Sequence, residues 1–369
     1  MHRTCPLSGV KQTWLFAVHM SAYDPKRTFA PSGDANPSDT IGLSSGAAMR
    51  RRDFIAFAAG IWPTSVLAQK NAKRPVIGVL SPFTDADNTL LADLRAGLRD
   101  FGYVEGQNLK IEYRSAEGHI EQLRGLVSDL IGADVDLIVT SSAPAIRIVR
   151  QTTTKLPVVF ARVGDALDQG IVQSLSHPGQ NTTGISWFAP ELSGKSIDIL
   201  KEISPKISHV AILREAAAGA ASALTAEAAA RRHGLKATIF QVRTAAELDT
   251  AFDGMKDAQV DSVIVLEGLM IFNNTKSIAA LATKSRLPTI FFDSRFVDAG
   301  GLVSYGPNFS DMHRRTAYFV DRILKGAKPG DIPVEQPTKF DLVINVSTAK
   351  ELGLGVSSTI LLRADRIVE

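Results

Sequence analysis

The sequence predicts an α/β fold with two lobes, each a parallel sheet with helices on both faces. Three observations predict this fold. After residue 74, short β-branched runs alternate with helical patterns, which is typical of parallel strands joined by crossover helices. This alternation runs through the chain twice, in two halves of similar length. The chain has 369 residues, 45% of them hydrophobic, and such a length favours two cores over one.

The first half contains four strand patterns and three helix patterns. The strands are short apolar runs bounded by turn residues, such as PVIGVLS before Pro82. The first helix places Leu90, Leu94 and Leu98 on one face, and Gly102 follows as a C-terminal cap. In chain order, we predict a strand at 75–81, a helix at 88–101, a strand at 109–113, a helix at 120–131, a strand at 136–140, a helix at 144–152 and a strand at 156–163.

The second half repeats this order of elements, although no strong repeat of residues accompanies it. We predict strands at 210–214, 236–242, 261–266 and 289–293, with helices between them at 221–233, 245–255 and 274–285. After these come a helix pattern at 311–325, a Pro-rich loop, a strand at 340–344 and a helix at 346–352. A chain that returns to the first lobe and then to the second crosses between them three times, and we expect the crossings near 184–188, 306–308 and 334–338.

A signal peptide is predicted at 49–68. Met49 begins a basic stretch, an apolar stretch follows, and Ala68 ends a run of small residues suited to signal peptidase. The paired arginines before Phe54 fit the twin-arginine signature, with general secretion as the alternative route. We therefore expect cleavage after Ala68 and a soluble periplasmic product. Residues 1–48 show no periodicity and are expected to be a non-native or disordered extension, which leaves the true start open between Met1 and Met49.

Composition and motifs exclude several classes of protein. The formal net charge is +3, but the basic excess lies in the first 68 residues, so the remainder offers nucleic acid no phosphate-neutralising surface. The single cysteine, Cys5, excludes a disulfide framework and a Cys-rich zinc site. The triplet at Gly194 lacks the preceding glycine of a P-loop, and the sequence contains no Gly-x-Ser-x-Gly or His-Glu-x-x-His motif. We therefore expect no catalytic residue, no metal and no cofactor.

Three ordered segments carry a family resemblance. They are GDALDQGIV with LSHPGQNTTG at 164–184, AGGLVSYGPN at 299–308, and LKGAKPGDIPVEQPT at 324–338. Together they resemble the family of ABC-transporter substrate-binding proteins that includes tryptophan/tyrosine uptake proteins. The resemblance implies the type I periplasmic binding fold with a three-crossover hinge, a periplasmic location and an ABC permease as partner. In that fold we predict an N-terminal lobe of 69–185 plus 307–333 and a C-terminal lobe of 186–306 plus 334–369.

The loops that follow the strands supply the candidate ligand-binding residues, because open α/β sheets bind ligands beyond the carboxyl ends of their strands. Ser141 and Ser142 precede a helix whose N-terminus suits a carboxylate, although they could equally cap it. Asp165 either takes an ammonium group or caps a turn. Arg295 pairs either with a ligand carboxylate or with a neighbouring aspartate. The candidates are Ser81, Phe83, Thr84, Ser141, Ser142, Ala143, Asp165, Phe188, Glu267, Phe272, Asp293, Arg295 and Tyr305, with Trp187 as a further aromatic wall or core residue.

These observations favour a monomeric solute-binding component of an ABC importer. Its ligand is expected to be a small molecule with a carboxylate, either amino-acid-like or aromatic, captured between the lobes and delivered to a membrane permease. Two alternatives remain open. One is a sensor that presents its closed form to a membrane receptor, and the other is an exported α/β enzyme.

Overall fold

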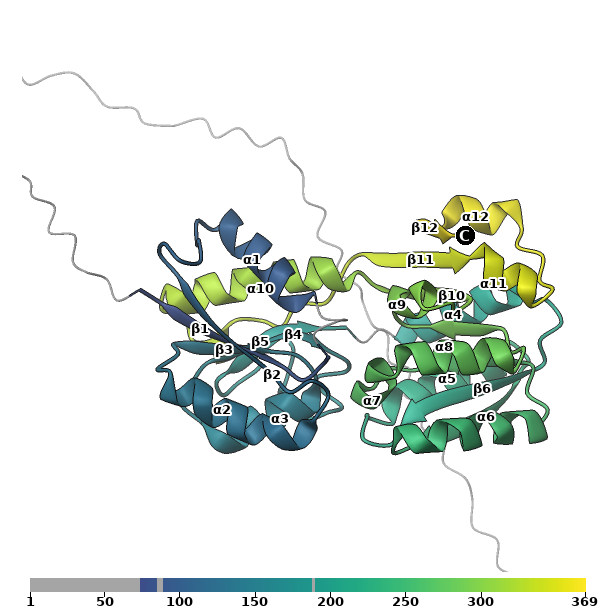
Figure 1. Cartoon of the computed structure of the whole chain (residues 1–369), viewed down its shortest axis with the longest axis horizontal. Coiled ribbons are helices and arrows are strands. Elements are labelled where there is room, and N and C mark those ends of the chain that lie inside the picture. Colours follow the sequence, from purple (N-terminus) through teal and green to yellow (C-terminus); the bar gives the residue numbers. More distant parts are fainter. Residues whose placement is uncertain (1–73, 85–88, 188–189) are drawn as a thin grey trace, which may run out of the picture. The chain divides into compact units, whose positions relative to one another are not determined.

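Two sheets organise the computed structural model, which describes residues 74–84, 89–187 and 190–369 (Figure 1). The first sheet has the strand order β2-β1-β3-β4-β5, and all of its strands are parallel. Its strands are β1 (Val76–Ser81), β2 (Lys110–Ser115), β3 (Leu137–Thr140), β4 (Val158–Val163) and β5 (Thr182–Ser186).

Helices cover both faces of the first sheet. On one face α1 (Leu90–Asp100) packs against α10 (Phe309–Leu324), and α10 also contacts β4 and β5. On the other face lie α2 (Leu123–Gly132) and α3 (Ala143–Thr152) (Figure 1). The strands present apolar side chains to both faces, as β3 and β4 show by being buried along their whole length. This is the pattern of a parallel sheet with two covered faces.

The second sheet has the order β12-β11-β10-β9-β8-β6-β7, and only β10 and β11 pair antiparallel. Its strands are β6 (His209–Glu215), β7 (Lys236–Val242), β8 (Ser262–Val265), β9 (Thr289–Phe291), β10 (Val303–Pro307), β11 (Phe340–Asn345) and β12 (Arg366–Val368). The helices of this half are α4 (Pro190–Ile203), α5 (Ala221–Arg232), α6 (Leu248–Asp257), α7 (Leu269–Asn273), α8 (Thr275–Lys284), α9 (Ser294–Asp298), α11 (Val346–Glu351) and α12 (Ser358–Arg363). Short 3-10 turns lie at Ile120–Gln122, Ala245–Glu247 and Pro329–Asp331.

The two halves are duplicates in strand order and in hydrogen bonding. The orders β2-β1-β3-β4-β5 and β7-β6-β8-β9-β10 are the same. In the first half, the Asp136 carboxylate accepts from Val76 N at 2.7 Å, and Asp136 N donates to Val76 O at 2.8 Å. In the second half, Asp261 makes the same two bonds with His209, at 3.1 and 2.9 Å. A repeat therefore exists between individual residues, where the sequence had indicated only a repeat of elements.

The strand register extends this equivalence of the two halves to residues of β4 and β9. Val158 in β4 and Thr289 in β9 pair with equivalent residues of β3 and β8. Arg162, near the end of β4, and Asp293, after β9, each lie four positions further along the chain, and the pairing of β4 with β5 shifts register between Phe160 and Val163.

Three crossings connect the two sheets, as expected for the type I periplasmic binding fold. The chain passes from β5 to α4, returns from β10 to α10, and crosses again before β11. The crossing segments also touch one another. Asn308 N donates to Lys339 O at 3.2 Å, and Ile185 forms a bridge with Glu335. The two-lobed α/β prediction is confirmed, while the predicted residue boundaries of the lobes stay a prediction.

Most predicted elements occur within a few residues of their expected bounds, and the exceptions are short or polar. The segments expected only as crossings at 184–188 and 306–308 belong in part to β5 and β10. No helix was predicted at α4, α7 or α9, and β9 ends at Phe291 instead of continuing to residue 293. The predicted extension at 1–48 and signal peptide at 49–68 lie outside the described residues. Within the described residues, no helix has the length and apolar character required to cross a membrane.

Candidate functional site

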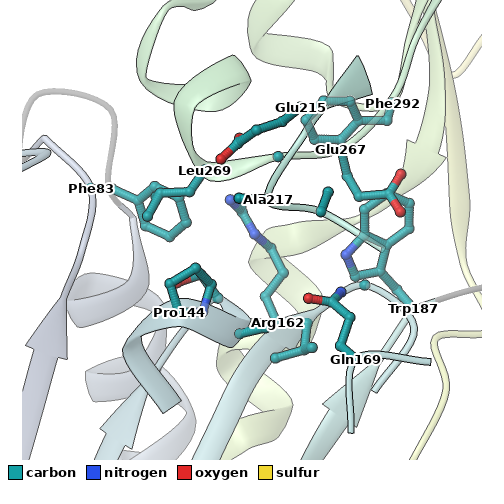
Figure 2. A pocket seen from close by; sticks show the side chains of 16 residues that line it. Phe83, Pro144, Arg162, Gln169, Trp187, Glu215, Ala217, Glu267, Leu269 and Phe292 are labelled. Atoms are coloured by element: carbon teal, nitrogen blue, oxygen red, sulfur yellow. The ribbon is translucent and has the colours of Figure 1, made fainter. Parts of the chain in front are cut away.

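A cavity lies at the carboxyl ends of strands from both sheets, where this class of fold binds ligands (Figure 2). Phe83 follows β1, Ser142 follows β3 and Arg162 ends β4, while Glu215 ends β6 and Glu267 follows β8. The cavity has a volume of about 60 Å³. The residues that line it are Phe83, Ser142, Ala143, Pro144, Arg162, Val163, Gly164, Gln169, Trp187, Glu215, Ala217, Ala218, Glu267, Gly268, Leu269 and Phe292.

Arg162 points into this cavity from the end of β4 (Figure 2). Arg162 is only 7% exposed. The guanidinium carbon lies 4.7 Å from the ring centre of Phe83 and 4.3 Å from the ring centres of Phe272 and Phe309. Phe83 and Phe272 also meet edge to face at 4.7 Å. The aromatic rings thus form a cage of a kind that stabilises a cation by contact with the ring faces.

The carboxylate of Asp293 interacts with two arginines beside the cavity. Arg295 donates to Asp293 from Nε at 3.1 Å and from Nη2 at 2.5 Å, whereas Arg162 Nη1 lies 3.8 Å from Asp293 Oδ2. Burial lowers the pKa of Arg162 to about 9, Arg295 adds to this lowering, and Asp293 opposes it. Burial alone would raise the pKa of Asp293, but the charge and hydrogen bonds of Arg295 hold it below its ordinary value.

Two carboxyl groups lie on the part of the wall that the second half provides. Glu215 accepts a hydrogen bond from Met270 N at 2.7 Å, and Glu267 accepts one from Ser222 Oγ at 2.5 Å. Burial raises the pKa of both glutamates above the ordinary value. They can therefore accept hydrogen bonds when ionised and donate them when protonated, as polar anchors in an otherwise apolar wall.

Trp187 and Phe292 form an aromatic wall on the same cavity. Their rings stack with a centroid distance of 5.8 Å and an interplanar angle of 16°. Trp187 also meets Phe309 edge to face at 5.5 Å. Figure 2 shows Trp187 beside the carboxyl group of Glu267 and the amide of Gln169. This part of the site suits the flat apolar body of a small molecule.

The N-terminus of α3 closes another side of the cavity. Ser142 has a φ of 70°, and its N–H donates to Arg162 O at 3.1 Å. The hydroxyl oxygens of Ser141 and Ser142 are buried and form no hydrogen bond with the described part of the chain. Neither serine therefore caps α3 through its side chain, and Ser142 lies against the cavity, as the sequence suggested for a ligand contact.

The predicted site residues fall into three groups. Those that line the cavity are Phe83, Ser142, Ala143 and Glu267. Those that lie elsewhere among the described residues are Ser81, Thr84, Ser141, Asp165, Phe272, Asp293, Arg295 and Tyr305. Phe188 lies outside the described residues. Ligand contact stays a prediction for every one of these residues.

Two charged candidates make the contacts within the protein that the sequence offered as alternatives to ligand binding. Asp165 Oδ1 accepts from Leu167 N and Asp168 N, both at 3.0 Å, as in a capped turn. Arg295 forms its salt bridge with Asp293, and its guanidinium stacks over Phe272 at 3.8 Å. Tyr305 lines a smaller neighbouring cavity of about 50 Å³, which also contacts Trp187 and Glu267.

Sequence reasoning missed Arg162, Gln169, Glu215 and Phe292. The sequence does mark Arg162 as a candidate site residue, because it is the only charged residue in the apolar run LPVVFARV. Glu215 had a comparable signal as an acidic residue at the end of a predicted buried strand. Gln169 and Phe292 had no signal, since their position depends on how distant loops meet.

This fold and cavity define a ligand-binding protein of the type I periplasmic binding class. The chain belongs to the family described as ABC transporter substrate binding protein, whose model matches residues 79–368. It is 23% identical over 260 residues to a tyrosine-binding protein of Clostridioides difficile (strain R20291), covering 70% of this chain and 74% of that protein.

Solved structures are similar as well. An ABC domain from Streptococcus pneumoniae in complex with L-Trp has a TM-score of 0.74 and 26% identity, covering 80% of this chain and all of that chain. A conserved domain protein from Vibrio cholerae has the same TM-score with 25% identity and the same coverage. The family resemblance expected from the three sequence segments is confirmed.

Proposed function

We propose that this protein is the exported solute-binding component of an ABC importer, and that it captures a small carboxylate-bearing molecule in the cavity between the two sheets. The observation that carries the proposal is the cavity itself. It lies at the ligand-binding edge of both sheets and combines buried charged groups with the Trp187–Phe292 wall. The similarity to an L-Trp complex and to a tyrosine-binding protein supports an amino-acid-like or aromatic ligand.

Ligand capture requires the cavity to change. A volume of about 60 Å³ is room for a few water molecules, since each needs roughly 10–15 Å³. An aromatic amino acid therefore enters only if the walls separate. The walls come from both halves, which are joined by three crossing segments, and so hinge motion at these segments is the route we propose. A ligand that contacts both halves then shifts the population towards the closed form.

The proposal also covers the location of the protein and the partner to which it delivers its ligand. The basic and apolar stretch at 49–68 supports export, by the twin-arginine or the general route, and cleavage after Ala68. We propose that the monomeric closed form delivers its ligand to an inner-membrane permease, and that the protein binds its ligand without chemical turnover. Cell fractionation tests export, and sequencing the N-terminus of the periplasmic protein tests cleavage, since a product that begins before Gln69 would contradict cleavage after Ala68.

Ligand binding is tested by thermal unfolding and calorimetry of residues Gln69–Glu369, which form one compact unit. L-Tryptophan, L-tyrosine, phenylacetate and branched-chain amino acids are the first probes. At a hundredfold excess over its dissociation constant, a ligand stabilises the folded state by roughly 2.7 kcal/mol, which raises the melting temperature by several degrees. The compound should be recovered unchanged. Absence of stabilisation across the panel would contradict the proposed ligand class.

A transport assay separates the importer from a sensor. Ligand-loaded protein should stimulate uptake into vesicles that contain the cognate permease and ATPase. Binding without any stimulation of uptake would instead favour a sensor that presents its closed form to a membrane receptor.

A further inference from the structure

Arg162 is the least satisfied charged group of the cavity. A guanidinium carries five N–H donors in a planar fork. Across residues 74–84, 89–187 and 190–369, the Arg162 side chain forms no hydrogen bond, and its nearest carboxylate oxygen is at 3.8 Å. That distance exceeds the range of a hydrogen bond. The fork therefore has no hydrogen-bond acceptor among these residues, and it points into a cavity.

Asp293 cannot supply the missing acceptors in this arrangement. It receives Nε, Nη2 and the backbone N–H of Arg295, at 3.1, 2.5 and 2.9 Å. Asp293 thus accepts its printed side-chain hydrogen bonds from Arg295 and meets Arg162 only at the longer distance of 3.8 Å. The other buried charged groups on the cavity, Glu215 and Glu267, bond to Met270 N and Ser222 Oγ instead.

The aromatic cage does not replace an acceptor. Contacts with the rings of Phe83, Phe272 and Phe309 stabilise the cation but supply no hydrogen-bond acceptor. Planar anions such as carboxylates match those edges with two parallel hydrogen bonds. A buried guanidinium of this kind suits a planar anion, and it lies at the carboxyl ends of the strands, where open α/β sheets bind ligands.

We propose that Arg162 is the anion-binding residue of this cavity, and that it selects ligands whose carboxylate pairs with its guanidinium in a bidentate manner. The inference rests on the proposed function and deepens it. The carboxylate of the ligand accepts two hydrogen bonds from the guanidinium of Arg162. The apolar body of the ligand lies along Trp187 and Phe292. An amide of the same shape lacks the charge and presents one oxygen only, so the site discriminates against it.

A comparison of acids with their amides tests the proposal. The probes are L-tyrosine with L-tyrosinamide and phenylacetate with phenylacetamide, measured by calorimetry on Gln69–Glu369. The wild-type protein should bind each acid on the order of 100-fold more tightly than its amide, because the amide leaves a buried charge unpaired. Arg162→Gln should reduce this preference to about threefold or less, and Arg162→Lys, which keeps the charge but not the fork, should be intermediate.

Two control variants test whether the preference for acids over amides depends on Arg162 in particular. Arg232→Gln removes an exposed arginine of α5 and should leave the preference unchanged. Ser142→Ala removes a hydroxyl from the N-terminus of α3, the competing anion site, and should change the preference far less than Arg162→Gln does.

The outcomes distinguish the inference from the proposed function. If Arg162→Gln binds the acids with an undiminished preference over the amides, the inference alone is overturned. The same holds if Arg162→Gln binds acid and amide both more tightly than the wild type, because Arg162 would then only block the cavity. A wild-type protein that binds neither acid would overturn the inference together with the proposed ligand class. The acid–amide comparison in the wild-type protein keeps the test decisive even if Arg162→Gln does not fold.

Discussion

Arg162, near the end of β4, and Asp293, after β9, meet with Nη1 of the arginine 3.8 Å from Oδ2 of the aspartate. Each lies four positions beyond equivalent residues of the two halves, so the carboxyl ends of corresponding strands carry opposite charges. The duplicated fold brings these strand ends together, and the two side chains interact between the halves.

Asp293→Asn should strongly destabilise the folded protein. The variant removes the buried carboxylate that pairs with Arg295 and lies 3.8 Å from Arg162, and breaking a buried ion pair from one side costs about 3–5 kcal/mol. Urea unfolding of Gln69–Glu369 measures the change in the free energy of unfolding. Asp298→Asn is the matched control, since Asp298 pairs with Arg366 on the surface, where both side chains are 46% exposed. It should change stability by less than about 1 kcal/mol.

A second substitution shows whether charge causes the loss. In the double variant Asp293→Asn, Arg162→Gln, the buried guanidinium that lies beside Asp293 is also gone, so part of the lost stability should return. Equal stability of the double variant and of Asp293→Asn would contradict an electrostatic coupling between these residues, because coupled neighbours are not additive.

Hydrophobic patterning was sufficient to predict the fold because strands such as β3 and β4 are buried on both faces and leave short apolar runs. The elements that escaped prediction lack such runs. β5 has the sequence TTGIS, in which Gly184 takes a φ of 151° and the threonines bury their hydroxyl-bearing side chains. The five-residue helices α7 and α9 are too short for a helical period to show.

The site was less predictable because its contacts join distant parts of the chain. Loop positions after the strands correctly indicated Phe83, Ser142 and Glu267 as residues near the cavity. Arg162 was taken for part of a buried strand, which it is, but its partners Phe272 and Phe309 lie more than a hundred residues away. Nothing in the local sequence specifies such an aromatic cage.

Glu267→Gln should remove a loss of stability that develops as the pH rises. Burial raises the pKa of Glu267, so the folded protein holds this proton more tightly than the unfolded chain does. The free energy of unfolding therefore falls as the pH rises from about 4.3, the ordinary value, to the raised pKa, by at most about 1.4 kcal/mol per pH unit. Glutamine resembles the protonated acid, so the variant and the wild type should be similarly stable at acid pH, and the variant should become the more stable above it.

Urea unfolding over a pH series measures this difference. Glu351→Gln is the matched control, because it makes the same substitution at an exposed position outside the cavity. A difference for Glu267→Gln that stays constant with pH would show that Glu267 titrates alike in the folded and unfolded chains, contrary to the effect of burial.

Gly306→Ala and Gly194→Ala should change stability in opposite directions. A Cβ atom on Gly306 would lie 1.9 Å from the backbone oxygen of Phe292, so the strand end that carries a cavity wall must shift. We expect a loss of about 1–3 kcal/mol and weaker ligand binding. Gly194 lies inside α4 with open space around its added Cβ, and alanine there should gain about 0.5–1 kcal/mol. Thermal unfolding of both variants measures the direction of each change in stability. A loss of stability in Gly194→Ala as well would contradict the open space around Gly194.

Trp187 should report ligand binding through its fluorescence. The chain has three tryptophans, and Trp14 and Trp62 precede the proposed cleavage site, so Trp187 is the only one in Gln69–Glu369. It is 8% exposed, lines the cavity and stacks on Phe292 at 5.8 Å. Separation of the cavity walls or ligand contact changes its surroundings. Titration with phenylacetate or L-tyrosine, with excitation selective for tryptophan, should therefore shift or quench its emission with the dissociation constant that calorimetry gives. Trp187→Phe should lose the signal, and emission that stays constant while calorimetry detects binding would place the ligand away from this wall.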